Sequence, residues 1–207
     1  LGTANEEVYT DMFRILRTDG AVAGEGAGIG LGLLLAGGGS ESKQREILNY
    51  CHKTQHEKII RGCSVGLALT AYGKEESAEP LVEQMVRDSD PIIRYGAMHA
   101  VAMAYCGTAD NGAVRRLLHV AVSDVSDDVR RGAVSCIGFV MCRSSETVPK
   151  LVSLLAESFN PHIRYGACMA VAVACAGTAF RDAIDLLQPM LDDKVDFVRS
   201  GAMMALS

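Results

Sequence analysis

A glycine-rich stretch is the first place where the sequence could hold a ligand. Residues 24–32 read GEGAGIGLG. The backbone N–H groups of such loops bind phosphate when the glycines follow G-x-G-x-x-G or precede G-K-[ST]. No register of this stretch gives G-x-G-x-x-G, and no G-K-[ST] follows any of its glycines. The spacing therefore predicts glycines that serve helix packing, and no cofactor site is expected.

Two neighbouring histidines come nearest to a metal-binding pattern. Residues 52–57 read HKTQHE, but the H-x-x-E-H pattern of zinc proteases requires glutamate where Gln55 stands, and H-E-x-x-H does not fit either. No C-x-x-C occurs in the chain, so a cysteine zinc site is not expected. The stretch is interpreted as the exposed end of a helix.

The other candidates for nucleophilic chemistry are histidines and cysteines in apolar surroundings. Cys106 near His99 is a weak indication of a thiol nucleophile with a base, but His99 and His119 are interpreted as histidines of the core or its rim. The seven cysteines lie mostly in apolar runs such as AVAVACAG. Their odd number and placement predict reduced, free thiols in a cytosolic or nuclear protein.

A hydrolase with a ring of helices is the remaining enzyme hypothesis. Such glycosidases need two carboxylates at the site, usually with aromatic platforms. The small, apolar segments that would line the ring contain almost no carboxylate apart from Glu25 and Asp128. The sequence therefore predicts no catalytic residues.

A row of arginines recurs along the chain, each two residues before a glycine that is repeated with it. One interpretation is a ladder of ion pairs with carboxylates just upstream, such as Asp88 or Asp124; the other is a basic groove for an acidic partner. The ladder is favoured because upstream carboxylates recur. The net charge of −5 argues against a general surface for nucleic acid or anionic membrane. The four arginines are Arg94, Arg130, Arg164 and Arg199.

The repetition extends over the whole chain. Residues 91–109 and 161–179 have nearly the same sequence, PIIRYGAMHAVAMAYCGTA and PHIRYGACMAVAVACAGTA. Successive copies of the central glycine are 34, 34, 36, 34 and 35 residues apart, which is the length of one helix–turn–helix repeat. These anchor glycines are Gly28, Gly62, Gly96, Gly132, Gly166 and Gly201.

The first helix of each repeat is composed of small apolar residues. Gly96, Ala100 and Ala104 recur every four residues on one helical face, and small residues at that spacing let two helix backbones approach closely. A glycine is expected to end each of these inner helices. The expected stop glycines are Gly39, Gly73, Gly107 and Gly177, whereas the fourth repeat has Arg143 at that place.

The second helix of each repeat is amphipathic and is expected to form an outer layer. In one of them the predicted apolar stripe is Val114, Leu117, Leu118, Ala121 and Val122. Arg115 and Arg116 lie outside this stripe and are the candidate partner contacts of that helix.

These patterns predict an all-α fold, an α-α solenoid built as a single array of about six repeats over residues 1–207, forming an arc or part of a toroid. The expected inner helices are 21–36, 58–72, 92–106, 128–142, 162–176 and 197–207. The expected outer helices are 5–18, 43–55, 76–88, 111–123, 146–158 and 180–192, with Pro189 kinking the last.

The repeat resembles the proteasome/cyclosome repeat of the toroidal scaffold subunits of the proteasome regulatory particle. The resemblance is carried by the stretches TQHEKIIRG, RRLLHVAVSDVSDDVRRGAV, PHIRYGACMAVAVACAGTA and VDFVRSGAMMA. It implies a non-catalytic scaffold for ubiquitin-dependent protein degradation in cytoplasm and nucleus. It also implies ATPase base and lid subunits as partners, and no obligate homo-oligomer.

Two other functions remain open at this stage, because a solenoid fold does not determine a function. One is a HEAT-like scaffold for transport or phosphatase assemblies, and the less favoured one is the ring-shaped hydrolase.

Overall fold

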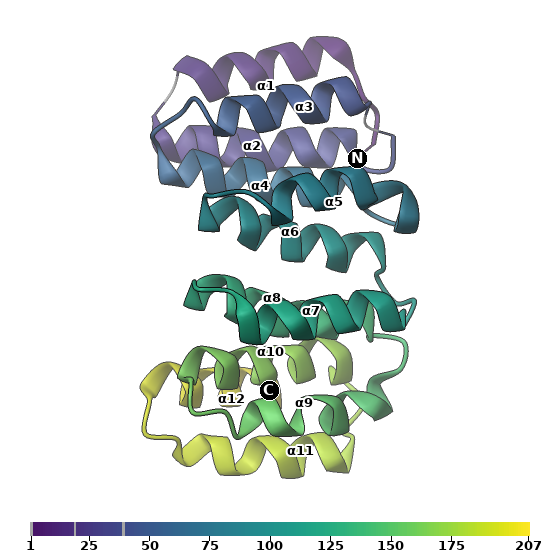
Figure 1. The fold of residues 1–207 in the computed structure, drawn as a ribbon, viewed down its shortest axis with the longest axis vertical. Coiled ribbons are helices and arrows are strands. Elements are labelled where there is room, and N and C mark those ends of the chain that lie inside the picture. The colour runs from purple at the N-terminus through teal and green to yellow at the C-terminus, as the bar shows by residue number, and fades with distance from the viewer. Residues whose placement is uncertain (1, 19, 39) are drawn as a thin grey trace. The chain divides into compact units, whose positions relative to one another are not determined.

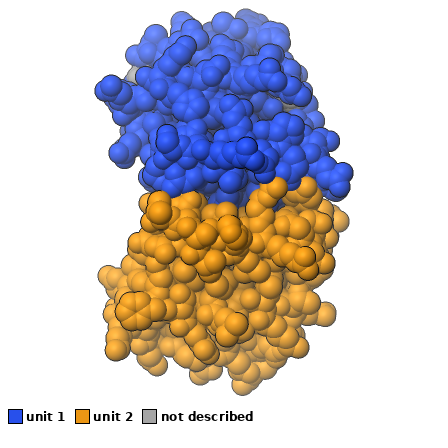
Figure 2. Space-filling model, viewed as in Figure 1, with its two compact units in different colours: residues 1–104 blue, residues 105–207 orange. Residues whose placement is uncertain are grey.

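The computed structural model describes residues 2–18, 20–38 and 40–207, and those residues form helices joined by short loops. The chain divides into two compact units, Leu1–Ala104 and Tyr105–Ser207, which Figure 2 colours separately. The all-α solenoid predicted from the sequence is confirmed. None of the helices in the described ranges is both long enough and apolar enough to cross a membrane.

Unit 1 contains three helix pairs in two layers (Figure 1). The inner helices pack on one another in chain order, and each outer helix packs on the inner helix that follows it. The inner helices are α2 (Ala21–Leu35), α4 (Glu57–Thr70) and α6 (Pro91–Ala104). The outer elements are α1 (Glu6–Thr18), α3 (Glu41–Cys51) and α5 (Glu79–Val86), the last preceded by the 3-10 helix η1 (Glu75–Ala78).

Unit 2 repeats the arrangement, with α8 packed on α10 and α10 on α12. Its inner helices are α8 (Asp127–Val140), α10 (Pro161–Cys175) and α12 (Asp196–Leu206). Its outer elements are α7 (Asn111–Ser123), η2 (Ser145–Thr147) with α9 (Val148–Ala156), and α11 (Arg181–Leu187) with η3 (Gln188–Asp192).

The starts of two inner helices follow from their capping residues. The Oδ1 atom of Asp90 accepts a hydrogen bond from the backbone N–H of Ile92 at 2.8 Å, and Oδ1 of Asn160 accepts one from His162 at 2.8 Å. α6 and α10 then begin with proline at the first helical position, where the missing N–H costs nothing. These two caps therefore determine where α6 and α10 begin.

Three of the outer helices are shorter than the sequence predicts, because each is partly a 3-10 helix. α5 and α9 follow short 3-10 segments and have Pro80 and Pro149 in their first turns. At Pro189 the predicted kink is instead a change of helix type, since α11 ends at Leu187 and continues as η3. Proline removes one backbone donor and clashes with the preceding turn, which shortens a regular α-helix.

The apolar stripe of α7 is centred differently from the prediction. Val122 is 66% exposed, because at 100° per residue it lies about 140° around the helix from Leu117. Leu118 is half-buried. The buried residues of α7 are Ala113, Val114, Leu117, Val120 and Ala121.

The loops that leave the inner helices share a conformation that favours glycine. Gly73, Gly107 and Gly177 have φ angles of +67°, +70° and +70°, which L side chains rarely adopt. In the first repeat Gly37 takes this role with φ +76°, while the predicted stop Gly39 lies outside the described residues. Arg143 lies over the preceding loop instead, since its Cδ is 3.1 Å from the point that a Cβ on Gly107 would occupy.

The Gly73 and Gly107 loops also cap the end of the next inner helix. The backbone N–H groups of Gly107 and Ala109 donate to the carbonyls of Phe139 and Val140, both at 3.0 Å. Ala109 has φ +56°, which directs its N–H toward the end of α8. The last carbonyls of a helix lack partners within it, so this loop satisfies two groups of α8. In unit 1 the N–H of Gly73 likewise donates to the carbonyl of Met103 in α6, at 3.1 Å.

Candidate interaction surface

Two anchor glycines of unit 1, Gly28 and Gly62, lie with Gly32 where α2 and α4 touch backbone to backbone. A Cβ added to Gly32 would lie 2.2 Å from the carbonyl oxygen of Gly66, and one added to Gly62 would lie 2.3 Å from the carbonyl oxygen of Glu25. At Gly28 the nearest atom would be a backbone nitrogen at 2.6 Å. Helix backbones cannot yield as side chains do, so these positions admit no side chain.

The other anchor glycines face side chains of the neighbouring inner helix, and Gly132 is buried within α8. An added Cβ would meet Ser64 at Gly96, Val134 at Gly166 and Tyr165 at Gly201, at 2.5, 2.8 and 2.8 Å. The anchors thus set the spacing of the inner layer and leave no room there for a ligand.

The glycine-rich stretch and the histidine pair are accounted for by helices. Residues 24–32 lie inside α2, where backbone N–H groups bond to carbonyls of the same helix. His52 ends α3 and its Nε2 lies 2.6 Å from Oδ2 of Asp88, while His56 is the N-cap of α4. Within the described ranges, no three His, Cys, Asp or Glu side chains are grouped so as to hold a metal ion.

The histidines considered for catalysis have local partners. Nδ1 of His99 is 3.1 Å from the carbonyl oxygen of Tyr95, and the two rings lie 4.5 Å apart. Burial lowers the pKa of His99, so it stays neutral at neutral pH. His119 is exposed on α7, with its Nδ1 3.4 Å from Oγ of Ser123.

The recurring arginines bind the loops that precede the inner helices. Nη1 of Arg94 donates to the backbone carbonyls of Asp88 and Ser89, at 3.0 and 2.9 Å. Nη1 of Arg164 donates to the two equivalent carbonyls of its own repeat, at 2.9 and 3.0 Å. Carbonyl oxygens, which the ladder hypothesis did not include, are therefore acceptors for both arginines.

In unit 2 the carboxylate partner of Arg164 lies downstream rather than upstream. Its Nε and Nη2 donate to both carboxylate oxygens of Asp193, at 2.7 and 2.8 Å, and the two side chains are 16% and 11% exposed. This paired contact holds the pKa of Asp193 below its usual range. Arg199 donates to the carbonyl of Asp193 at 2.8 Å, and Arg130 pairs with Asp127 in its own helix.

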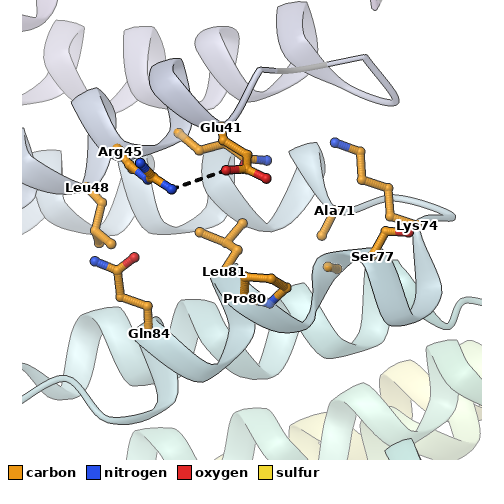
Figure 3. A pocket seen from close by; sticks show the side chains of 11 residues that line it. Glu41, Arg45, Leu48, Ala71, Lys74, Ser77, Pro80, Leu81 and Gln84 are labelled. Atoms are coloured by element: carbon orange, nitrogen blue, oxygen red, sulfur yellow. Dashed lines mark hydrogen bonds and ion pairs between the residues drawn. The ribbon is translucent and has the colours of Figure 1, made fainter.

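A groove between the outer helices α3 and α5 offers a cavity of about 590 Å³ (Figure 3). Leu48 and Leu81 line it from the two helices but are only 1% and 8% exposed, and an ion pair between Glu41 and Arg45, at 3.1 Å, borders it. Lys74 stands at one end of the groove. Glu41 and Arg45 are exposed, so the rim of the groove offers charged groups to a partner.

Two further grooves also lie between outer helices. The one between α1 and α3, of about 600 Å³, is lined by Phe13 and Tyr50 together with Arg17, Arg45 and Lys53. The one between α9 and α11 has about 360 Å³. It is lined by Pro149, Lys150, Ser153, Asp182, Asp185 and Leu186.

The loops from outer to inner helices add exposed apolar side chains in unit 2. Val125 and Phe159 each lie seven residues before an anchor glycine, and they are 89% and 101% exposed. Arg115 on α7 is exposed and Arg116 is half-buried, so Arg115 is the more available of the two predicted contacts.

The grooves have no signature in the sequence, because each depends on how the side chains of two helices meet. Pro80 and Pro149 mark only where an outer helix is shortened beside a groove.

Known proteins resemble the chain over its whole length. HEAT repeats match residues 114–207. The 26S proteasome non-ATPase regulatory subunit 1 homolog A of Arabidopsis thaliana is 61% identical over 100% of this chain and 20% of its own length. The 26S proteasome non-ATPase regulatory subunit 1 of Drosophila melanogaster is 51% identical over 99% of this chain and 20% of its own length. The 26S proteasome regulatory subunit RPN2 of Candida glabrata is 48% identical over 100% of this chain and 22% of its own length.

The chain spans about a fifth of the length of these relatives. It is homologous throughout to a segment of the 26S proteasome non-ATPase regulatory subunit 1 family, which confirms the resemblance found in its sequence.

Proposed function

We propose that the chain is part of a non-catalytic scaffold of the proteasome regulatory particle, acting in ubiquitin-dependent protein degradation. The observation that carries the proposal is 61% identity over the entire chain to a protein named as a non-ATPase regulatory subunit. On this proposal the six helix pairs belong to one repeat array.

The distribution of surface features supports a binding role for the outer layer. Inner helices are packed through glycine and alanine, whereas the grooves between α1 and α3, α3 and α5, and α9 and α11 combine apolar and charged side chains. Varied outer surfaces over a constant inner layer let a solenoid bind several distinct neighbours. Subunits of the ATPase base and of the lid are the proposed partners, in cytoplasm and nucleus.

The test is affinity purification of a chimera in which this chain replaces the matching segment of the Candida glabrata subunit. Mass spectrometry should recover ATPase and lid subunits with the chimera as it does with the unmodified subunit. Recovery of phosphatase subunits or transport cargo instead would support the HEAT-like alternative, which the match to HEAT repeats favours. Turnover in a glycoside-hydrolase screen would contradict the absence of catalysis.

A further inference from the structure

The groove between the outer helices α1 and α3 carries a charge opposite in sign to that of the whole chain. Its charged lining, among the described residues, consists of three cations and one anion, all of them exposed: Arg17, Arg45, Lys53 and Glu46. The chain as a whole has a net charge of −5. Cations gathered on one surface of an acidic protein attract anionic groups to that surface, so the groove is suited to an acidic ligand.

Aromatic side chains form the floor of this groove and hold its two helices together. Phe13 of α1 and Tyr50 of α3 meet edge to face, with ring centroids 5.8 Å apart. The hydroxyl of Tyr50 donates a hydrogen bond to the backbone carbonyl of Leu16 in α1, at 2.9 Å. The guanidinium of Arg17 lies over the Phe13 ring, 4.5 Å from its centroid. The charged side chains of the groove therefore rise from two helices whose packing is fixed beneath them.

The ion pairs of the groove leave both of its arginines available to a partner. Nη2 of Arg17 is 3.6 Å from Oε1 of Glu46, and the arginine side chain is 58% exposed. Nη2 of Arg45 is 3.1 Å from Oε2 of Glu41, and this arginine side chain is 72% exposed. Pairs between exposed side chains contribute little free energy. A carboxylate of another protein can therefore replace either glutamate, and it can accept two hydrogen bonds from one guanidinium.

The spacing of the polar side chains along α3 fits an extended segment of protein. Arg45 and Asn49 are one turn apart on α3, Lys53 lies just after the helix, and all three line the groove. A rise of 1.5 Å per residue separates Arg45 from Lys53 by about 12 Å along the helix axis. An extended chain covers about the same distance in four residues. Two acidic residues four positions apart can therefore reach both cations, with the amide of Asn49 between them.

We propose that the α1–α3 groove binds an extended segment of a partner protein that is rich in aspartate and glutamate. Arg17, Arg45 and Lys53 bind its carboxylates. The inference rests on the proposed function, because it gives the chemistry of one segment that the outer layer binds. A single-stranded nucleic acid is disfavoured, because bases bind by stacking on aromatic faces. The Phe13 ring is only 5% exposed and lies under the guanidinium of Arg17.

The experiment measures binding of rhodamine-labelled octaglutamate to the 207-residue chain by fluorescence anisotropy at low salt. Saturable binding is expected, and it should weaken as added salt screens the charges. Arg45→Gln and Lys53→Gln should each weaken binding by about threefold to fivefold, the range of one exposed ion pair. Glu46→Gln should strengthen binding, because it removes the carboxylate that lines the groove. Its amide oxygen can still accept the hydrogen bond that the hydroxyl of Tyr9 donates at 2.9 Å.

Arg181→Gln on α11 is the matched control for Arg45→Gln. Arg181 is 80% exposed and pairs with Asp185, four residues away, at 3.1 Å. Arg45 pairs with Glu41 at the same spacing and distance, but Arg181 does not line the groove. Arg181→Gln should therefore leave the affinity for octaglutamate unchanged, and circular dichroism should show that all variants are folded.

Three results would overturn the proposal. The first is no binding of octaglutamate at low salt. The second is an equal loss for Arg181→Gln and Arg45→Gln, which would mean that total charge and not the groove attracts the peptide. The third is equal affinity for labelled octathymidylate with the same dependence on Arg45, which would mean that the groove accepts any polyanion. Recovery of regulatory-particle subunits by the chimera is measured separately, so failure of this inference can be distinguished from failure of the proposed function.

Discussion

The inner and outer helices of each 35-residue repeat differ in how closely they pack. In the inner layer, α2 and α4 come so close that a Cβ at Gly32 would lie 2.2 Å from a backbone oxygen. In the outer layer, α5, α9 and α11 are shortened by 3-10 segments, and grooves open beside them. The difference shows that repetition in the sequence is required by backbone contact, whereas variation is allowed wherever a helix faces solvent.

The strongest test of this contrast compares two glycines of α2. Gly32→Ala is expected to destabilise the fold by about 3 kcal/mol, because the new methyl group would overlap the backbone of α4. Gly26→Ala is the matched control: no atom lies within 4 Å of its Cβ position, so alanine should stabilise the helix by up to about 1 kcal/mol. Urea denaturation measures both, and equal effects would contradict the close approach of α2 and α4.

A smaller difference in folding stability is expected between variants of an arginine on an inner helix and of one on an outer helix. Arg164→Met removes the paired contact with Asp193 and two bonds to carbonyls, at an expected cost of about 2 kcal/mol. Arg181→Met removes an ion pair whose arginine is 80% exposed, and such pairs contribute at most about 1 kcal/mol. If thermal melting gives the same shift for both variants, the loop-binding role assigned to Arg164 is wrong.

Inner and outer histidines should also differ in how stability depends on pH. Burial lowers the pKa of His99, so between its folded and unfolded values the unfolded chain binds more protons. Stability due to His99 is therefore complete above about pH 6.5 and falls as the pH decreases through this window. His99→Gln should reduce the difference between urea midpoints at pH 7.5 and 5.5.

His119→Gln, at an exposed position of α7, is the control for that measurement and should leave the difference unchanged. An unchanged pH dependence in His99→Gln would show that its ring is charged or exposed in the folded chain.

The smallest effect is expected at the surface of α7. Arg115→Glu changes an exposed side chain, so the free energy of unfolding should stay within about 0.5 kcal/mol of wild type. Chemical denaturation checks this value, and a loss above 1.5 kcal/mol would place Arg115 in a structural contact.

Much of the inner layer could be predicted from the sequence because glycine and alanine at a fixed spacing have few other uses. The expected segment 162–176 corresponds to α10, Pro161–Cys175. The ends of the outer helices were less predictable. A proline such as Pro189 can kink a helix, end it or convert it to a 3-10 helix, and packing determines which of these occurs.

The interaction surface could be predicted only in outline. The positive φ of Ala109 depends on carbonyls in a helix 30 residues later, which local preferences do not show. The downstream partner of Arg164 and the α3–α5 groove likewise arise from stacking of neighbouring repeats. The exposure of Val125 and Phe159 was not predictable from the aligned repeats either, because the same position holds Gln55, Ser89 and Lys194 in three others.

The central claim is that partners bind the outer helices and not the inner ones. Arg45 on α3 and Arg61 on α4 provide a direct test, because both are exposed and one lies in each layer. The two charge reversals are placed separately in the Candida glabrata chimera, and recovery of regulatory-particle subunits is quantified by affinity purification and mass spectrometry. The account predicts a several-fold loss for Arg45→Glu and wild-type recovery for Arg61→Glu, with both proteins folded. Wild-type recovery for Arg45→Glu together with a loss for Arg61→Glu would contradict it.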